Sequence, residues 1–248
     1  MEEKSFLEHL EDFRFVLLKS ALVVCLLSML AFAFAPVLLK LILWPFHAAV
    51  SRFDLHPPST ALLRTLRPTG AFVLSMKLAI GAGFTLSLPF VLWFLGKFVL
   101  PGLTQREKRY LLPSLGAGTL LFLTGMGFCY FVMLPTALGF FWTYGEKLGI
   151  ANEWTIEYYT ALVVQLLLAF GLVFELPVVL LFLVKVGIVG PTALREKRKY
   201  VIVGIFIVAA AVTPTPDVIS QIFLAVPMLL LYEICIWVAY AMERRGKK

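Results

Sequence analysis

The sequence predicts an all-α, polytopic membrane protein with six transmembrane helices, of which the fifth and sixth are short. Of its 248 residues, 60% are hydrophobic and 15% are charged, and the mean hydropathy is +0.91. Soluble domains are about half apolar and a quarter charged, so this composition excludes an ordinary soluble domain. The apolar residues form continuous runs of helical length, whereas a membrane β-barrel shows alternating segments of about ten residues.

The first expected span follows an acidic segment and precedes a long connection. In residues 1–19 apolar side chains recur every three or four positions, which predicts an amphipathic helix at the membrane surface. Span one, residues 15–35, is expected to end at Pro36, because proline cannot continue the hydrogen bonding of a helix. Residues 37–46 are too few to cross a membrane and are expected to lie in the interface, with Trp44 as an anchor. The other spans are expected at 70–94, 111–134 (closed by Pro135), 160–184, 200–212 and 218–240, in one membrane domain over residues 1–248.

The last two spans are expected to form a short hairpin. A helix over residues 200–212 rises only about 20 Å, less than the hydrocarbon core of about 30 Å. The sequence TPTPD, from Thr213 to Asp217, predicts a turn, and Asp217 can cap the helix that follows. Such a hairpin needs tilting or local thinning of the bilayer. We expect Gln221, close to this turn, to face a partner rather than lipid.

The basic residues predict the orientation in the membrane. With the N-terminus in the cytoplasm, the cytoplasmic segments contain sixteen lysines and arginines and the outer segments contain six. Basic loops remain on the cytoplasmic side, so both termini are expected there, in a cytoplasmic (inner) membrane. The net charge of +7 therefore needs no nucleic acid to explain it.

Glu175 is a carboxylate well inside the fourth expected span. A charge at such a position costs roughly 3 kcal/mol or more unless it is paired, hydrated or neutralised by a proton. Gly171 lies one turn earlier on the same face, and Pro177 frees the carbonyl group of Val173 from its helical hydrogen bond. These features favour a polar point in a membrane cavity that a partner or substrate segment enters. A protonated glutamate bonded to a neighbouring helix, or to the freed carbonyl, is the structural alternative.

No catalytic or metal-binding pattern is visible. The three histidines lie outside the expected spans, and no H-E-x-x-H, G-x-S-x-G or nucleotide-binding loop occurs. The three cysteines lie in apolar runs without the spacing of a metal site. We therefore expect no enzyme, no metal and no cofactor. A proton- or ion-coupled secondary transporter that uses Glu175 is the main alternative, although such folds usually contain inverted repeats and no second broken helix is evident. An assembly scaffold without a peptide site is a further alternative.

Two groups of acids lie near the expected cytoplasmic surface. Thr104 and Glu107 fit the capping-box pattern S/T-x-x-E before an apolar run, which predicts that Glu107 caps span three. A capping residue can still face a ligand. Glu8, Glu11 and Asp12 lie within one turn of the N-terminal segment, and this charge pattern fits either a solvated acidic face or a docking patch for a cationic partner.

Five stretches match a known family in order and in spacing. They are HLEDFR at 9–14, SLP at 87–89 with Phe98 and EKR at 107–109, GMGFCYF at 125–131 with Pro135, AFGLVFELP at 169–177, and TPTPDVISQ at 213–221. Together they resemble the TatC family, the polytopic subunit of the twin-arginine protein translocase. The resemblance covers nearly the whole chain, and short fifth and sixth helices are also a feature of that family.

The resemblance implies a receptor that binds twin-arginine signal peptides of folded precursors. It implies a signal-peptide site at Asp12 and Glu107, because a carboxylate matches the two-pronged guanidinium group of arginine. Asp12 stands where the family usually has Glu, and the neighbouring Glu11 could substitute for it. The positions that shape this site in the family correspond here to Arg14, Phe98 and Arg109.

The resemblance also implies partners and a source of energy. Glu175 corresponds to the acid that faces the concave membrane cavity in the family, and Thr213, Asp217 and Gln221 belong to the polar region where single-span TatA/TatB-type subunits dock. The family assembles from several copies and exports folded proteins with the proton-motive force, without nucleotide hydrolysis.

Overall fold

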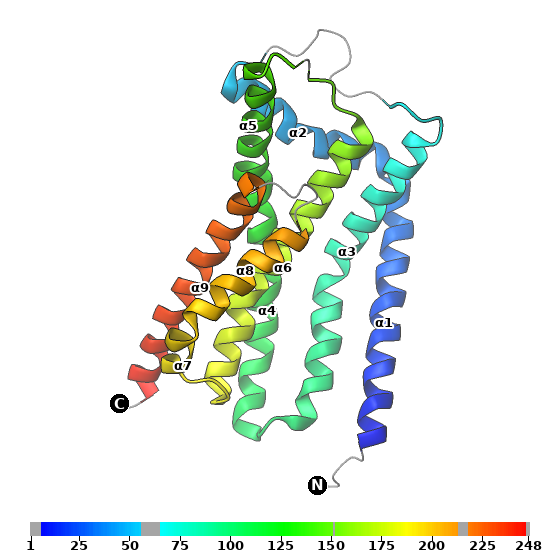
Figure 1. Cartoon of the computed structure of the whole chain (residues 1–248). Helices are drawn as coiled ribbons and strands as arrows, with labels where there is room; N and C mark the ends of the chain where they lie inside the picture. The colour runs from blue at the N-terminus through cyan, green and yellow to red at the C-terminus, as the bar shows by residue number, and fades with distance from the viewer. Residues whose placement is uncertain (1–5, 56–64, 151, 213–217, 247–248) are drawn as a thin grey trace.

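Long helices form the body of the molecule, and one shorter helix lies across one end of it (Figure 1). The computed structural model describes residues 6–55, 65–150, 152–212 and 218–246. Within these ranges the chain is helical and contains no strand, so the prediction of an all-α fold is confirmed. The helices are α1 (Phe6–Ala33), α2 (Ala35–Phe53), α3 (Gly70–Val99), α4 (Gln105–Phe128), α5 (Leu134–Lys147), α6 (Ile156–Val186), α7 (Pro191–Glu196), α8 (Arg198–Val212) and α9 (Val218–Gly246), with a 3-10 turn at Leu100–Gly102 and a π turn at Cys129–Met133.

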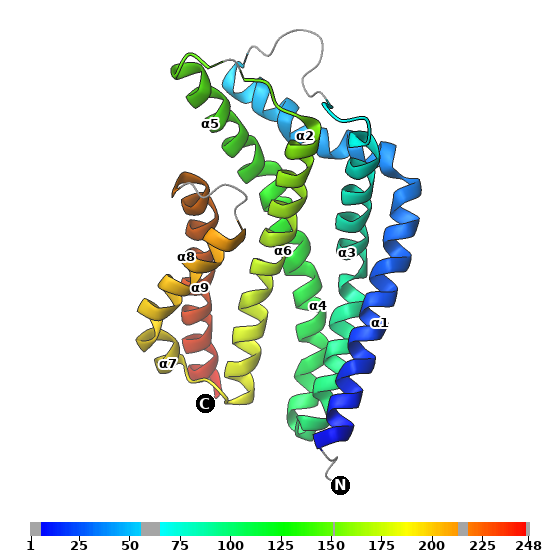
Figure 2. The same cartoon turned by 45° about the vertical axis from the view of Figure 1, so that its right-hand side comes forward.

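Five segments of the described chain are long and apolar enough to cross a membrane. They are Glu8–Ala33, Gly70–Gly102, Lys108–Lys147, Ile156–Val186 and Gln221–Arg244. The protein is therefore a multi-pass membrane protein. Helix α8 has only 15 residues and rises about 22 Å, as expected for residues 200–212. Figures 1 and 2 show that the α8–α9 hairpin stops well short of the end where α2 lies. The count of six spans and the orientation of the termini stay predictions.

The N-terminal segment differs from the expectation of a separate surface helix over residues 1–19. Helix α1 is one uninterrupted helix from Phe6 to Ala33 (Figure 2). No proline or glycine occurs between these residues, so nothing in the backbone interrupts helix propagation from the acidic segment into the apolar run. The expected surface segment is thus continuous with the first span within the described residues, and its position at the membrane surface stays a prediction.

The helix of the third expected span does not close at Pro135. It passes through the π turn and continues as α5 to Lys147. Pro135 lies in the first turn of α5, a position where proline is tolerated because the wider π turn has already changed the hydrogen-bond register. The expected end of this span at residue 134 is therefore wrong for the helix, which forms a single apolar segment over Lys108–Lys147.

Helix α2 is fixed across the bundle by two tyrosines. It is longer than the interfacial segment expected at 37–46 and contains Pro45, which cannot donate to the carbonyl group of Leu41. The hydroxyl group of Tyr130, in the π turn, donates to that carbonyl at 2.7 Å. The hydroxyl group of Tyr159, at the start of α6, donates to the carbonyl of Ile42 at 2.7 Å. The side-chain hydroxyls thus tie α2 to both long helices beneath it.

The α7–α9 segment is closed by polar contacts at the end of the molecule that holds both chain termini. The hydroxyl group of Tyr232 donates to the carbonyl of Leu194 at 2.7 Å. Arg198 and Glu233 form an ion pair, and both side chains remain partly exposed. Helix α9 also packs against α6, which joins this segment to the body of the bundle.

Candidate functional site

The N-terminal end of α1 packs against the end of α3. The imidazole ring of His9 stacks on the ring of Phe98, with centroids 4.4 Å apart and planes 21° apart. Phe13, one turn further along the same face of α1, places its ring 5.4 Å from Phe98. The HLEDFR stretch and the loop that follows α3 are far apart in sequence, and these aromatic contacts bring them together.

The structure describes the side chains of Asp12 and Glu11 but not that of Glu107. Asp12 is half-buried and takes part in an interaction within the chain, whereas Glu11 is exposed. Glu107 belongs to the first turn of α4, which begins at Gln105 directly after Thr104, as the capping-box pattern predicts for the start of the helix. The side chain of Glu107 lies outside the described residues, so its contacts stay a prediction.

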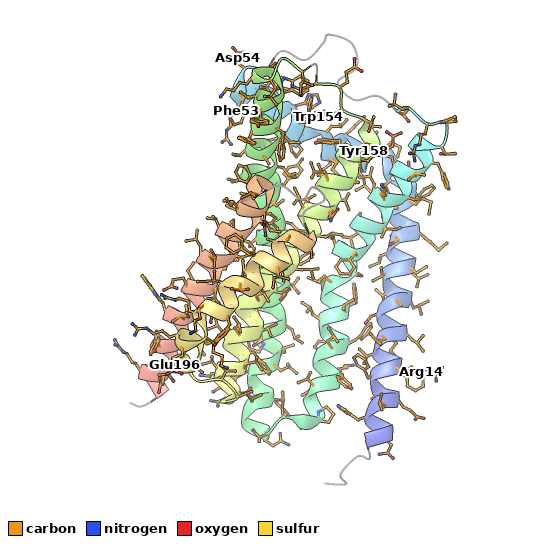
Figure 3. All side chains as sticks on the ribbon, viewed as in Figure 1. Arg14, Phe53, Asp54, Trp154, Tyr158 and Glu196 are labelled. Carbon is orange, nitrogen blue, oxygen red and sulfur yellow. The ribbon has the colours of Figure 1, made fainter. Side chains whose placement is uncertain are left out.

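The two arginines expected to shape the site are arranged differently. Arg14 is exposed and points away from the bundle (Figure 3), so it does not contact Phe98 in this structure. Arg109 donates from Nη2 to the hydroxyl group of Tyr110 at 2.5 Å. Lys185, at the end of α6, places Nζ 4.7 Å from the centroid of the Tyr110 ring. The contact with Lys185 therefore links the start of α4 to the end of α6.

Sequence reasoning did not single out Tyr110. The available signal was an aromatic residue directly after the basic REKR run, and by itself it would also fit an interfacial anchor. The contact with Lys185 is a long-range one that no local pattern reveals.

Glu175 lies on α6 and faces α4. A Cβ atom added to Gly118 of α4 would lie 2.7 Å from Oε2 of Glu175, so a larger residue at this position would force the carboxyl group to move. Oε1 of Glu175 is buried and has no hydrogen-bond partner in the described part of the chain. The structural alternative, a glutamate bonded to the neighbouring helix or to the carbonyl of Val173, therefore finds no support at this oxygen.

Glycines bring α4 and α6 close enough for this contact. A Cβ atom on Gly125 would lie 2.7 Å from the carbonyl oxygen of Phe170, and one on Gly171 would lie 2.5 Å from the ring of Phe122. Small residues at a crossing let two membrane helices approach at backbone distance. The same close approach holds the carboxyl group of Glu175 against the backbone of α4.

The polar residues near the α8–α9 turn are only partly described. Gln221 donates from Nε2 to the carbonyl of Phe206 on α8 at 2.8 Å. This amide group therefore binds within the hairpin, whereas the sequence led us to expect it to face a partner. Thr213 and Asp217, the other two residues of the expected docking region, lie outside the described residues.

Comparison with known proteins identifies the family. The family model described as "Sec-independent protein translocase protein (TatC)" matches residues 8–227. A relative from Akkermansia muciniphila with that same name is 45% identical over 184 residues, which cover 74% of this chain and 53% of the relative. The chain thus spans about half the length of this relative. A relative of the same name from Carboxydothermus hydrogenoformans is 35% identical, and the match covers 96% of this chain and 95% of the relative. Another, from Aquifex aeolicus, is 34% identical, and the match covers 97% of each chain.

Solved structures agree with the sequence comparison. A crystal structure of the twin-arginine translocase receptor TatC has a TM-score of 0.81 and 34% identity, and the match covers 94% of this chain and 98% of that one. A second, obtained in the detergent DDM, has a TM-score of 0.80. The family model matches most of the chain, and two relatives align along almost their whole length. This chain therefore belongs to the TatC family of Sec-independent protein translocase proteins.

Proposed function

We propose that this chain is the receptor and core subunit of a twin-arginine translocase, and that it binds signal peptides where α1 meets the loop between α3 and α4. The observation that supports this most is the stacking of His9 and Phe13 on Phe98. It holds the acidic turn of α1 beside the loop that leads to Glu107. This contact supports a site to which the acids of α1 and the loop with Glu107 both contribute, at one end of the bundle.

The recognition chemistry is a pairing of guanidinium groups with carboxylates. Charge-assisted hydrogen bonds of this kind are about twice as strong as neutral ones, and arginine can make two at once. Asp12 and Glu107 are the proposed partners, and Glu11 is exposed one position away. Arg109 is held on Tyr110. Phe98 supports the site by packing, and Arg14 contributes positive charge at its edge.

The remaining steps use other parts of the bundle. Glu175 provides the polar point that an arriving segment meets inside the membrane. Single-span partner subunits dock on the α8–α9 hairpin near Thr213, Asp217 and Gln221, where apolar residues such as Ile207 and Ile222 are exposed. Several such assemblies export folded proteins across the cytoplasmic membrane with the proton-motive force, and both termini of this chain lie in the cytoplasm.

A peptide-binding measurement tests the proposal. The full chain in lipid nanodiscs is titrated with a fluorescent twin-arginine peptide and with the same peptide carrying two lysines. We expect the lysine peptide to bind at least tenfold more weakly, because lysine cannot make the two-pronged contact. Glu107→Gln is expected to lose about 1.5–3 kcal/mol of binding, the contribution of a hydrogen bond to a charged group.

Glu196→Gln is the matched control. Glu196 is an exposed acid on α7, at the same end of the molecule but away from α1 (Figure 3). Its substitution changes the net charge by the same amount and is expected to leave binding unchanged. Equal affinity of the wild-type chain for the two peptides would contradict the proposal, and so would equal losses in Glu107→Gln and Glu196→Gln.

A further inference from the structure

An apolar groove opens on the side of the bundle below α2. It consists of two adjoining hollows of about 240 Å³ and 450 Å³, which we call the α2 groove. The hollows share Leu41 of α2, Met126 of α4 and Leu167 of α6, so they are continuous. The other residues used below are Gly81 and Thr85, which line the first hollow, and Trp44, Gly127 and Tyr130, which line the second.

Both hydroxyl groups that line the α2 groove are already engaged. Thr85 Oγ1 donates to the carbonyl of Gly81 at 2.9 Å and lies 3.7 Å from the sulfur of Met126. The hydroxyl group of Tyr130 donates to the carbonyl of Leu41. A polar solute or a row of water molecules would therefore lose hydrogen bonds on entering the groove. The chemistry of the walls selects hydrocarbon.

Two lysines lie one helical turn from residues that line the groove. Lys77 precedes Gly81 by one turn on α3, and Lys40 precedes Trp44 by one turn on α2. Residues four apart lie on the same face of a helix, so each lysine continues a stripe that lines the groove. Both side chains are exposed. A ligand with a long apolar part and a negatively charged end is complementary to this arrangement.

We propose that the α2 groove binds one phospholipid, with an acyl chain along Leu41, Met126 and Leu167 and the phosphate group near Lys40 and Lys77. A transmembrane helix fits less well. A helix with its side chains is about 10–12 Å wide. An acyl chain is narrower and can bend from one hollow into the other.

Substitutions of two glycines on α4 distinguish lipid bound in the α2 groove from lipid bound elsewhere on the surface. A Cβ atom on Gly127 meets no atom within 4 Å, so Gly127→Leu is chosen to place a side chain in the larger hollow. Gly116, on the same helix, is equally open but does not line the groove, so Gly116→Leu is the matched control. The purified full chain, stripped of lipid, is titrated with dioleoyl phosphatidylglycerol and observed by native mass spectrometry.

We expect the wild-type chain and Gly116→Leu to retain one tightly bound lipid, and Gly127→Leu to bind it about tenfold more weakly. The double substitution Lys40→Gln with Lys77→Gln leaves the groove intact and is expected to weaken binding several-fold. If Gly127→Leu does not fold, this double variant tests the proposal instead. Unchanged affinity in the double variant would overturn the proposal, as would equal affinity in the two glycine variants. A wild-type chain that bound an apolar helical peptide but no tight lipid would overturn it as well.

Discussion

At the scale of single residues, Glu175 combines a chemical requirement with a packing one. Its carboxyl group lies between two membrane helices, against Gly118, and its Oε1 is buried without a hydrogen-bond partner in the described chain. An uncompensated charge there is costly, so the neutral form fits this environment better than the ionised one. The residue is also the only acid on α6 beyond its first turn.

Substitutions that differ in charge test this view of Glu175. Glu175→Gln keeps the size and neutrality of a protonated acid and is expected to retain most precursor export. Glu175→Lys places a longer cation against α4, at a cost of roughly 3 kcal/mol, and is expected to abolish export. Export of a twin-arginine reporter is measured in cells that lack their own copy, with the amount of each variant in the membrane as the control. Equal loss in both variants would mean that the charged carboxylate is required.

At the scale of elements, α2 is held both by apolar packing and by hydrogen bonds from side-chain hydroxyl groups. Tyr159 is 3% exposed and donates to the carbonyl of Ile42, whereas the adjacent Tyr158 is 77% exposed. Tyr159→Phe is therefore expected to lower the free energy of unfolding by about 1 kcal/mol, the typical contribution of such a bond. Tyr158→Phe is the matched control and should change it little. Urea or thermal unfolding in detergent measures both, and equal effects would contradict this role for Tyr159.

The helices show how far sequence patterns reach. Apolar runs predicted long apolar helices where α3, α6 and α9 lie, because hydropathy depends only on local composition. Proline was a poorer guide. Pro135 does not end its helix, since a π turn precedes it, and Tyr130 within that turn donates to α2, a contact across 89 positions. Local patterns contain no information about such a bond.

Some features of the candidate site could be predicted from the sequence, and others could not. The aromatic contact between His9 and Phe98 joins two stretches that the family resemblance had already paired, so the outline of the site was predictable. The inward direction of Gln221 and the outward direction of Arg14 were not, because each depends on how a helix is rotated within the bundle. The glycine that receives Glu175 was not predictable either, for the same reason.

At the scale of the whole molecule, the distribution of charge gives a testable orientation. Asp54 and Glu196 lie at opposite ends of the bundle (Figure 3). The end with Glu196 also carries most of the basic residues, among them Arg195 on α7, Lys197 directly after it and Lys199 on α8. Basic segments stay in the cytoplasm, so the end with Asp54 should face outward.

Cysteine labelling of whole cells decides the orientation. In a background with Cys25→Ser, which removes the one exposed native thiol among the described residues, Asp54→Cys and Glu196→Cys are treated with a membrane-impermeant maleimide. Asp54→Cys is expected to react in intact spheroplasts, and Glu196→Cys only after the membrane is opened. The background chain without either substitution reports residual labelling of Cys129 and Cys235, which are buried. The reverse pattern would place both termini outside, and the acids on α1 could then not meet a signal peptide arriving from the cytoplasm.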